Sequence, residues 1–242
     1  MRDWLTQALL DSASDTPEDA SCYVVGRGLP ARLMEEMRVG VWKCPYDPPP
    51  DEEFNKRHGL CGMKVEGWIS IPLWTPRGKI IGVEFRRWDG EKEVMKYHLP
   101  DSDWAPVFAG MVPSSLNKIW SGGDVWIVEG IFDLCISHVV PPTDAILSCG
   151  GAKITNQQID FLKRFLSPNS MVHVCFDMDE TGRNMANGYV HPDTGKRVWG
   201  VTERLSKVGI RNRVVRYGGG KDPGEIWEAG GKSMLKTSLG FK

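Results

Sequence analysis

The chain has 242 residues, of which 41% are apolar and 25% charged, and its formal net charge is −1. This length is enough to bury a substantial core, and the composition is that of a soluble globular protein. A chain so close to neutral carries no polybasic arm, so any binding of a polymer must come from a local patch. It contains no apolar run of about eighteen residues, which excludes a transmembrane helix. With no visible signal peptide, we expect a cytoplasmic protein of a bacterium or a virus-infected cell.

The six cysteines are scattered, which suits a reducing compartment. Cys44 and Cys61 flank a proline-rich stretch with His58 between them. Zinc sites normally show pairs of ligands at short spacing, and this stretch does not, so the pattern favours a loop without zinc. The tryptophan- and proline-containing segment 41–62 is a candidate docking surface for a partner, although an ordinary surface loop is the commoner case.

The first half of the chain predicts a smaller α+β subdomain over residues 1–120. A short helix is followed by a loop over residues 11–21, and Pro30 then fits the first turn of a second helix. From Trp68 to His98 the pattern changes to apolar strands separated by the turns TPRGK and WDGEKE, which indicates an antiparallel sheet. The charged residues on this sheet are, by themselves, what an exposed sheet face would carry.

The second half, residues 121–242, alternates strands with helices, which predicts a mostly parallel sheet flanked by helices. Apolar strands are expected near residues 124–129, 144–149, 171–177 and 210–217. Thr155 and Gln158 form a capping-box pattern at the start of one helix. Residues 189–199 have a Pro-Asp-Thr-Gly centre and predict an inserted hairpin.

Acidic residues follow three of these strands, each with a glycine close behind: Glu129, Asp177 with Asp179, and Asp222. The carboxyl ends of parallel strands share one edge of a sheet, where ligands bind. Carboxylates also cap helices, so each acid alone is weak evidence for a site. Clustered acids repel one another unless a cation lies between them, and glycine lets a phosphate approach the backbone. The pattern leaves a metal–phosphate site and a set of helix caps both open.

The motifs VEGIFD, CFDMDETGRNMA and GGGKDPGE, in this order, resemble those of the TOPRIM domain. SCGGAKITNQQIDFLKRF is similar to the segment that joins the first two motifs. Upstream, IPLWTPRGKIIGVEFRRW followed by MKYHLP resembles the sheet of the RNA-polymerase core in bacterial, DnaG-like primases and in phage primase–helicases. The resemblance covers roughly residues 24–230, and the upstream sheet is the part that favours primases over other TOPRIM proteins.

The resemblance implies a TOPRIM-type α/β fold and a DNA primase, a nucleotidyltransferase that makes short RNA primers on single-stranded DNA from nucleoside triphosphates. It implies that Asp177, Asp179 and Asp222 hold Mg²⁺ or Mn²⁺, and that Glu129 is either an acid/base catalyst or a further carboxylate that organises the metal. It also implies a set of residues that bind nucleotide or template: Arg86, Lys96, Tyr97 and Lys221.

Two features depart from the family pattern. The last motif has Gly224 where a second aspartate is usual, so only Asp222 carries over and Glu225 is a substitute candidate. No zinc-binding module or helicase domain is visible, so we expect a core that works with a replicative helicase or a template-recognition module, a viral variant, or a piece of a longer protein. Two alternatives stay open: a TOPRIM-family metal-dependent nuclease, and a non-catalytic nucleic-acid-binding replication module.

Overall fold

The computed structural model describes residues 3–43, 65–91, 93–98 and 108–241. Residues 44–64 lie outside the described part. The predicted loop, the group formed by Cys44, His58 and Cys61, and most of the candidate docking segment therefore lie outside the described residues. Among the described helices, none is long and apolar enough to cross a membrane.

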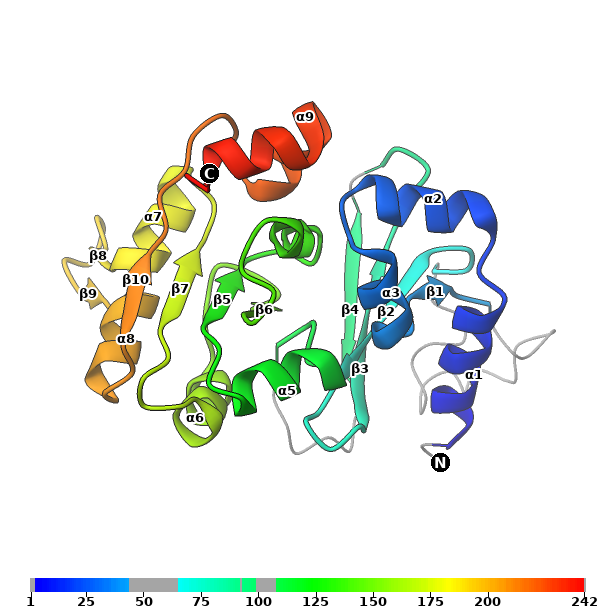
Figure 1. Cartoon of the computed structure of the whole chain (residues 1–242), viewed down its shortest axis with the longest axis horizontal. Coiled ribbons are helices and arrows are strands. Elements are labelled where there is room, and N and C mark those ends of the chain that lie inside the picture. The colour runs from blue at the N-terminus through cyan, green and yellow to red at the C-terminus, as the bar shows by residue number, and fades with distance from the viewer. Residues whose placement is uncertain (1–2, 44–64, 92, 99–107, 242) are drawn as a thin grey trace.

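The first half forms helices over an antiparallel sheet, as the sequence predicts (Figure 1). In the described residues the sheet has the strand order β1-β2-β3-β4. The strands β2 and β3 are the two arms of the predicted hairpin, and β4 pairs with β3. Its elements are α1 (Asp3–Ser14), α2 (Glu18–Gly26), α3 (Ala31–Met37), β1 (Gly40–Val41), β2 (Ile69–Trp74), β3 (Ile80–Arg86) and β4 (Val94–His98).

The loop predicted over residues 11–21 was wrong in part. α1 continues to Ser14 and α2 begins at Glu18, so only a short connection separates the two helices. Pro17 occupies the N-cap of α2, and Glu18 with Asp19 in the first turn favourably oppose the helix dipole. The polar residues that suggested a loop here are therefore the residues that begin α2. Pro30 also lies one position earlier than predicted, at the N-cap of α3.

The second half contains a parallel sheet of order β10-β7-β5-β6, which confirms the predicted fold class. The segment after β5 forms a helix of the 3₁₀ type, η1. The elements from residue 113 onward are α5 (Pro113–Trp120), β5 (Val125–Val128), η1 (Phe132–His138), β6 (Ala145–Ser148), α6 (Asn156–Phe165), β7 (Val172–Cys175), α7 (Glu180–Asn187), β8 (Tyr189–Val190), β9 (Arg197–Val198), α8 (Val201–Lys207), β10 (Asn212–Val214) and α9 (Pro223–Ser238).

Local chemistry explains where several of these elements begin and end. The Thr155 side chain accepts from the Gln158 N–H at 3.1 Å, and the Gln158 side chain accepts from the Thr155 N–H at 2.8 Å, which is the predicted capping box of α6. Within α9, Gly230 and Gly231 leave helical geometry and kink the helix. The predicted hairpin is β8 paired with β9.

One buried hydrophobic cluster runs through both halves of the chain, from Val24 and Leu29 under α2 to Ile127 and Leu147 in the parallel sheet. A bridge between Ala109 and Ser148 joins the segment that precedes α5 to β6. The division into domains at residue 120 stays a prediction. α5, which lies before that boundary, packs against β6, which lies after it.

Candidate metal and nucleotide site

The first strand end that bears an acid is that of β5. All four residues of β5 are buried, and Glu129 follows directly as the chain emerges from the sheet. The Glu129 carbonyl accepts from the Ser148 hydroxyl and from the Gly151 N–H, each at 2.9 Å. These two bonds fix the backbone of Glu129 against the loop that follows β6, so the position of its side chain is set by two strands.

The second strand end is that of β7. The Asp177 N–H donates to Glu129 Oε1 at 3.0 Å. The Asp179 side chain caps α7 by accepting from the Gly182 N–H at 2.8 Å. A Cβ on Gly182 would lie 2.2 Å from the Asp177 carbonyl oxygen and 2.8 Å from Glu129 Oε1. A residue with no side chain is therefore required where α7 begins, because the helix start lies directly against both acids.

The third acidic loop lies before α9. The Asp222 side chain caps α9 by accepting from the Glu225 N–H at 2.7 Å. The Met178 N–H donates to the Lys221 carbonyl at 2.7 Å, which joins this loop to the Asp177–Asp179 segment. Glu225, the candidate substitute for the missing acid, instead accepts from the Lys221 N–H through its side chain.

Asp133 is a fifth acid at this site and was not among the residues predicted from the sequence. It is buried in η1, where its Oδ2 accepts from the Gly130 N–H at 2.8 Å and its Oδ1 from the Gly224 N–H at 3.1 Å. It thereby connects the first motif to the third. Asp133 is the last residue of VEGIFD, one helical turn after Glu129, and that spacing was the signal available in the sequence.

The acids perturb one another. Burial, followed by the charge of Asp177, raises the pKa of Glu129 to about 7. Burial, followed by the charge of Asp222, raises the pKa of Asp133 to about 7. The pKa of Asp177 is also raised, first by burial and then by Asp222. The four acids predicted from sequence therefore lie close enough to interact, together with Asp133.

Lys221 is the cation that partly offsets this negative charge. Its Nζ lies 3.3 Å from Asp177 Oδ2 and 3.3 Å from Asp179 Oδ2. The pKa of Asp179 is lowered, mainly by the hydrogen bond from Gly182 and further by Lys221. One lysine does not neutralise five carboxylates. The donor set is oxygen only, which is what Mg²⁺ prefers, so the residues fit a divalent cation.

Arg86 and Lys96, predicted to bind nucleotide or template, extend from the antiparallel sheet toward these loops. Both pair with the buried Glu84, Arg86 Nε at 2.6 Å and Lys96 Nζ at 3.4 Å. Lys96 also donates to the Gly150 carbonyl in the loop after β6. The Arg86 guanidinium lies 5.0 Å from the centre of the Phe132 ring in η1. The two cations therefore face the parallel sheet across the junction of the two halves.

Tyr97, the remaining predicted residue, lies on β4, where its backbone pairs with Val83. Its side chain is outside the described part of the structure, so its role in binding stays a prediction. The roles of the other predicted residues are likewise predictions, although their positions are defined.

A second group of ligand-type side chains lies at the opposite end of the parallel strands. Atoms of Asp124, Asp144 and His173 lie within 4.8 Å of one another and could hold a metal ion. Each is already engaged: His173 Nε2 with Asp124 at 2.9 Å, and Asp144 Oδ2 with the Trp126 indole N–H at 3.0 Å. Arg213 also donates to His173 Nδ1 at 2.9 Å. The complete hydrogen bonding favours a structural network.

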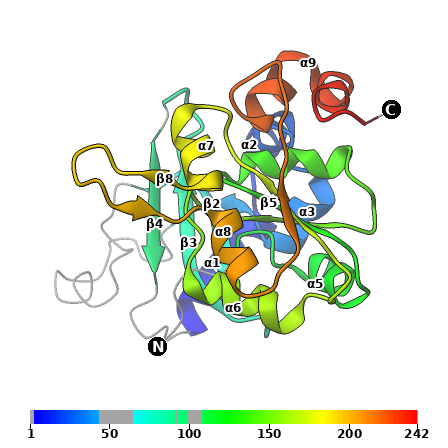
Figure 2. The same ribbon diagram turned by 90° about the vertical axis from the view of Figure 1, so that its left-hand side faces the viewer.

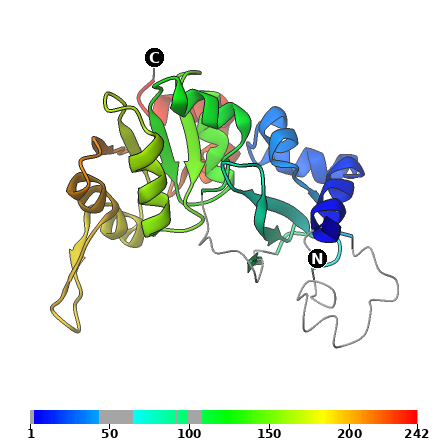
Figure 3. The same cartoon turned by 90° about the horizontal axis from the view of Figure 1, so that it is seen from below.

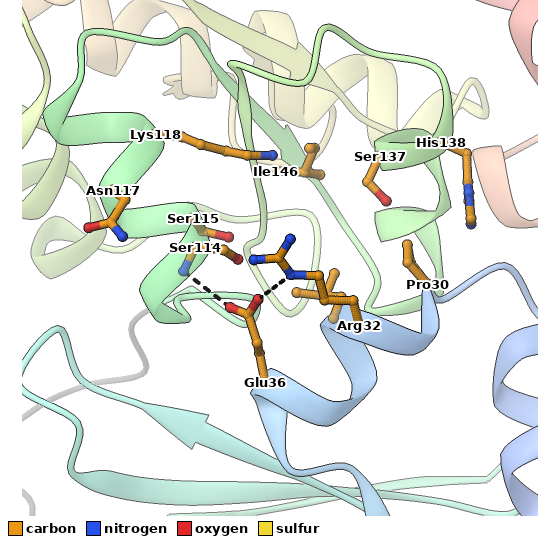
Figure 4. A pocket seen from close by; sticks show the side chains of 11 residues that line it. Pro30, Arg32, Glu36, Ser114, Ser115, Asn117, Lys118, Ser137, His138 and Ile146 are labelled. Atoms are coloured by element: carbon orange, nitrogen blue, oxygen red, sulfur yellow. Dashed lines mark hydrogen bonds and ion pairs between the residues drawn. The ribbon is translucent and has the colours of Figure 1, made fainter.

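A cavity of about 450 Å³ lies between α3 and α5, away from the acids (Figure 4). Glu36 Oε2 accepts from the Ser114 N–H at 3.1 Å and Oε1 from Arg32 at 3.0 Å. The carboxylate of α3 thus binds the first turn of α5, and the pKa of Glu36 is lowered although its burial opposes this. None of the residues predicted to form the site lines this cavity.

With the geometry in place, two comparisons define the class of this chain. Residues 126–227 match a family model described as Toprim-like, which covers nearly all of the parallel sheet and the five acids at its edge, from Glu129 to Asp222. Across nearly its whole length the chain has the fold of a DnaG catalytic core. The resemblance drawn from the sequence motifs is thereby confirmed for the domain and the fold.

Three solved structures illustrate the likeness. The zinc-binding and RNA polymerase domains of Aquifex aeolicus primase share 21% identity, with a TM-score of 0.62, over 99% of this chain and 61% of that one. A DnaG primase catalytic domain bound to single-stranded DNA shares 17%, with a TM-score of 0.56, over 98% and 82%. The primase fragment of the bacteriophage T7 primase–helicase shares 17%, with a TM-score of 0.54, over 89% and 72%. This chain thus spans less than two thirds of the Aquifex chain. Among curated protein sequences, none matches it.

Proposed function

We propose that this chain is the catalytic core of a DNA primase, a nucleotidyltransferase that makes short RNA primers on single-stranded DNA. The observation that carries the proposal is the convergence of Glu129, Asp133, Asp177, Asp179 and Asp222 at one sheet edge. Two cations of the antiparallel sheet contact the neighbouring segments, Lys96 at Gly150 and Arg86 at Phe132. The DnaG-type fold supports the same function, because this arrangement belongs to a core whose relatives are primases.

In the proposed reaction a primer 3′-hydroxyl attacks the α-phosphate of a nucleoside triphosphate. A new phosphodiester bond forms as the bond to pyrophosphate breaks, and the hydroxyl proton leaves to a base. Asp177, Asp179 and Asp222 would hold Mg²⁺ or Mn²⁺, which neutralises phosphate charge and lowers the pKa of a bound hydroxyl. Positioning and charge then account for most of the rate, because the protein has little covalent chemistry to perform.

Glu129 is suited to accept the proton or to organise the acids around it. A pKa of about 7 lies near the working pH, where a general base is most effective. Lys221, which bridges Asp177 and Asp179, is free to turn to a triphosphate once another cation neutralises these two acids. Arg86 and Lys96 would hold phosphates of the nucleotide or template at the same edge.

The proposed partners are single-stranded DNA, nucleoside triphosphates, and a helicase or template-recognition module. The DnaG domain bound to single-stranded DNA supports the first, and the phage primase–helicase supports the last. The purified chain, incubated with single-stranded DNA, Mn²⁺ or Mg²⁺ and labelled ribonucleotides, should make short primers. Cleavage of the DNA without added nucleotides would instead identify a nuclease, and binding without either product would identify a non-catalytic module.

A further inference from the structure

A hairpin projects from the Toprim-like domain between α7 and α8. We call residues 188–200 the arm; it consists of β8 and β9, paired as Tyr189 with Val198 and Val190 with Arg197. Its tip is closed by hydrogen bonds between His191 and Lys196 and between Gly195 and His191, each 2.9 Å. Figures 2 and 3 show it projecting from the rest of the domain, and Figure 1 shows it at the end of the molecule away from the antiparallel sheet.

The two ends of the arm are tightly packed against each other at its base, unlike the ends of an unconstrained loop. A Cβ on Gly200 would lie 2.1 Å from the Gly188 nitrogen, and one on Gly188 would lie 2.2 Å from Glu203 Oε2. Gly188 also has a φ of +82°, which favours glycine. Glu203 Oε2 accepts from the Gly200 N–H at 2.9 Å. The two ends of the arm are therefore held together at a fixed point of the fold.

The arm exposes apolar surface beside positive charge. Val190 is 57% exposed and Trp199 is 52% exposed, which makes them two of the most exposed large apolar residues in the described chain. Lys196 and Arg197 are exposed on β9 and its approach, and Lys207 Nζ of α8 lies 4.8 Å from the Trp199 ring centre. Arg197 pairs with Glu203 at the base, and Asp193 is the acid at the tip. A functional explanation is called for, because half of this large apolar side chain stays exposed although Lys207 lies over the ring.

We propose that the arm binds single-stranded DNA, as a second contact for the template outside the catalytic edge. This inference rests on the proposed function, which supplies the single strand. An exposed aromatic ring flanked by cations is the combination that holds single strands without reading sequence, because every base can stack. α7 starts at the catalytic Asp179 and rises about 12 Å over its eight residues. The arm therefore begins within reach of a strand that leaves the acids.

The experiment compares four variants of the whole chain, of which Lys196→Ala probes the salt dependence. Trp199→Ala removes the stacking ring, and replacement of residues 189–199 by two glycines removes the arm, which the close approach of Gly188 and Gly200 permits. Trp120→Ala is the matched control, because Trp120 is 55% exposed on α5, away from the arm. Binding to a fluorescent oligodeoxythymidine is followed by anisotropy across a range of salt concentrations, without nucleotides or metal.

Both arm variants should bind the single strand about tenfold more weakly, the size of effect expected from losing one stacked base. Trp120→Ala should bind like the unchanged protein. Lys196→Ala should lower the slope of log affinity against log salt by about 0.7, the value for one phosphate contact on a single strand.

Equal affinity of the arm variants and the Trp120→Ala control would overturn the inference. So would an arm-less protein that keeps its DNA affinity but changes its oligomeric state in sedimentation, because the arm would then be a contact between copies. The binding assay needs no primer synthesis, so the two proposals fail separately. If the chain makes primers but binds DNA equally well without the arm, only this inference is wrong. If the arm variants bind DNA more weakly but the chain makes no primers, only the proposed reaction is wrong.

Discussion

The backbone N–H of Asp177 donates to Oε1 of Glu129 at 3.0 Å, so the acid that ends β7 is held against the acid that ends β5. The hydrogen bond itself favours the charged form of Glu129, but burial and the nearby charge of Asp177 outweigh it and favour a bound proton or a bound cation. Burial, followed by the negative charge of Asp177, raises the pKa of Glu129 to about 7. The metal-free site therefore stores an electrostatic cost that a divalent cation would relieve.

We expect the thermal stability of the metal-free protein to fall as the pH rises from about 5 to about 7.5. Glu129 and Asp133 have folded-state pKa values of about 7, above their ordinary values, so the folded state binds more protons than the unfolded state in this window. Stability must then decrease with pH. Melting temperatures measured in a chelator give the test, and a flat or rising profile over this window would contradict it.

Glu129→Gln should flatten this profile and raise the melting temperature at pH 7.5. Glutamine keeps an oxygen to accept from the Asp177 N–H but carries no charge. Added Mg²⁺ should stabilise the unchanged protein more than the variant, because the variant offers one carboxylate fewer. The same variant should lose most primer synthesis. An unchanged pH profile in Glu129→Gln would show that this carboxyl does not titrate near neutral pH.

Asp179 has two roles that two substitutions separate. Asp179→Ala should lower stability by about 1 kcal/mol, because it removes the cap of α7. Asp179→Asn should keep the cap and the stability. Both should abolish primer synthesis, because a metal ligand with negative charge is lost. Asp177→Ala should be inactive as well, with the fold intact.

Activity and circular dichroism melts of these variants give the measurement. Asp160→Asn is the matched control, since Asp160 is an exposed acid on α6 and should lose neither activity nor stability. Full primer synthesis by Asp179→Asn would remove this residue from the proposed metal site.

Arg86→Ala and Lys96→Ala should each weaken binding of nucleotide or single-stranded template and reduce its dependence on salt. Each cation that contacts a phosphate releases counterions on binding. In either single variant, the remaining cation still pairs with the buried Glu84, so the fold should persist. Removing both should be strongly destabilising, because a buried charge is left unpaired.

Affinity measured at several salt concentrations tests this, with Lys163→Ala on α6 as the control for the loss of one exposed cation. If both single variants bind with the same salt slope as the control, the cations of this sheet are ordinary surface charges.

The parallel sheet and its acidic edge were predictable because strand and helix periods alternate clearly after residue 121, and because acids follow three strands. Asp133 was missed because its importance comes from contacts over a long sequence separation: it accepts from Gly224, far along the chain, as well as from Gly130. Glu84 was missed for a related reason, since in sequence it reads as one more charge on an exposed sheet. Its burial depends on how β3 packs in the folded chain.

The start of α2 shows a local limit. Residues near Pro17 have the composition of a loop and of a helix start alike, and the packing of buried Ala20 and Val24 decides in favour of the helix. Lys221 shows a limit that comes from tertiary structure. Its place between two acids follows from the Met178–Lys221 backbone bond, which no sequence spacing announces.

Gly224 occupies the position where the primase motif usually has a second aspartate, and it offers a direct test of that departure. Its N–H donates to Asp133 Oδ1 at 3.1 Å, and a Cβ there would lie 3.2 Å from Asp222 Oδ1 and 3.4 Å from Asp133 Oδ1. An aspartate at this position fits the backbone if the neighbouring carboxylates give by a few tenths of an ångström. It would add a negative charge beside two acids that already repel each other.

Gly224→Asp should therefore lower the melting temperature of the metal-free protein at pH 7.5, and lower it less at pH 5, where Asp133 is protonated. Because the start of α9 favours negative charge by up to about 1 kcal/mol, the loss should be partial. The rise in melting temperature on adding Mg²⁺ should be larger than in the unchanged protein, because one more oxygen ligand faces the cation. Gly224→Asn is the matched control, with similar size and no charge. If Gly224→Asp and Gly224→Asn respond equally to Mg²⁺, position 224 does not face the metal, and the missing aspartate has no consequence for cation binding.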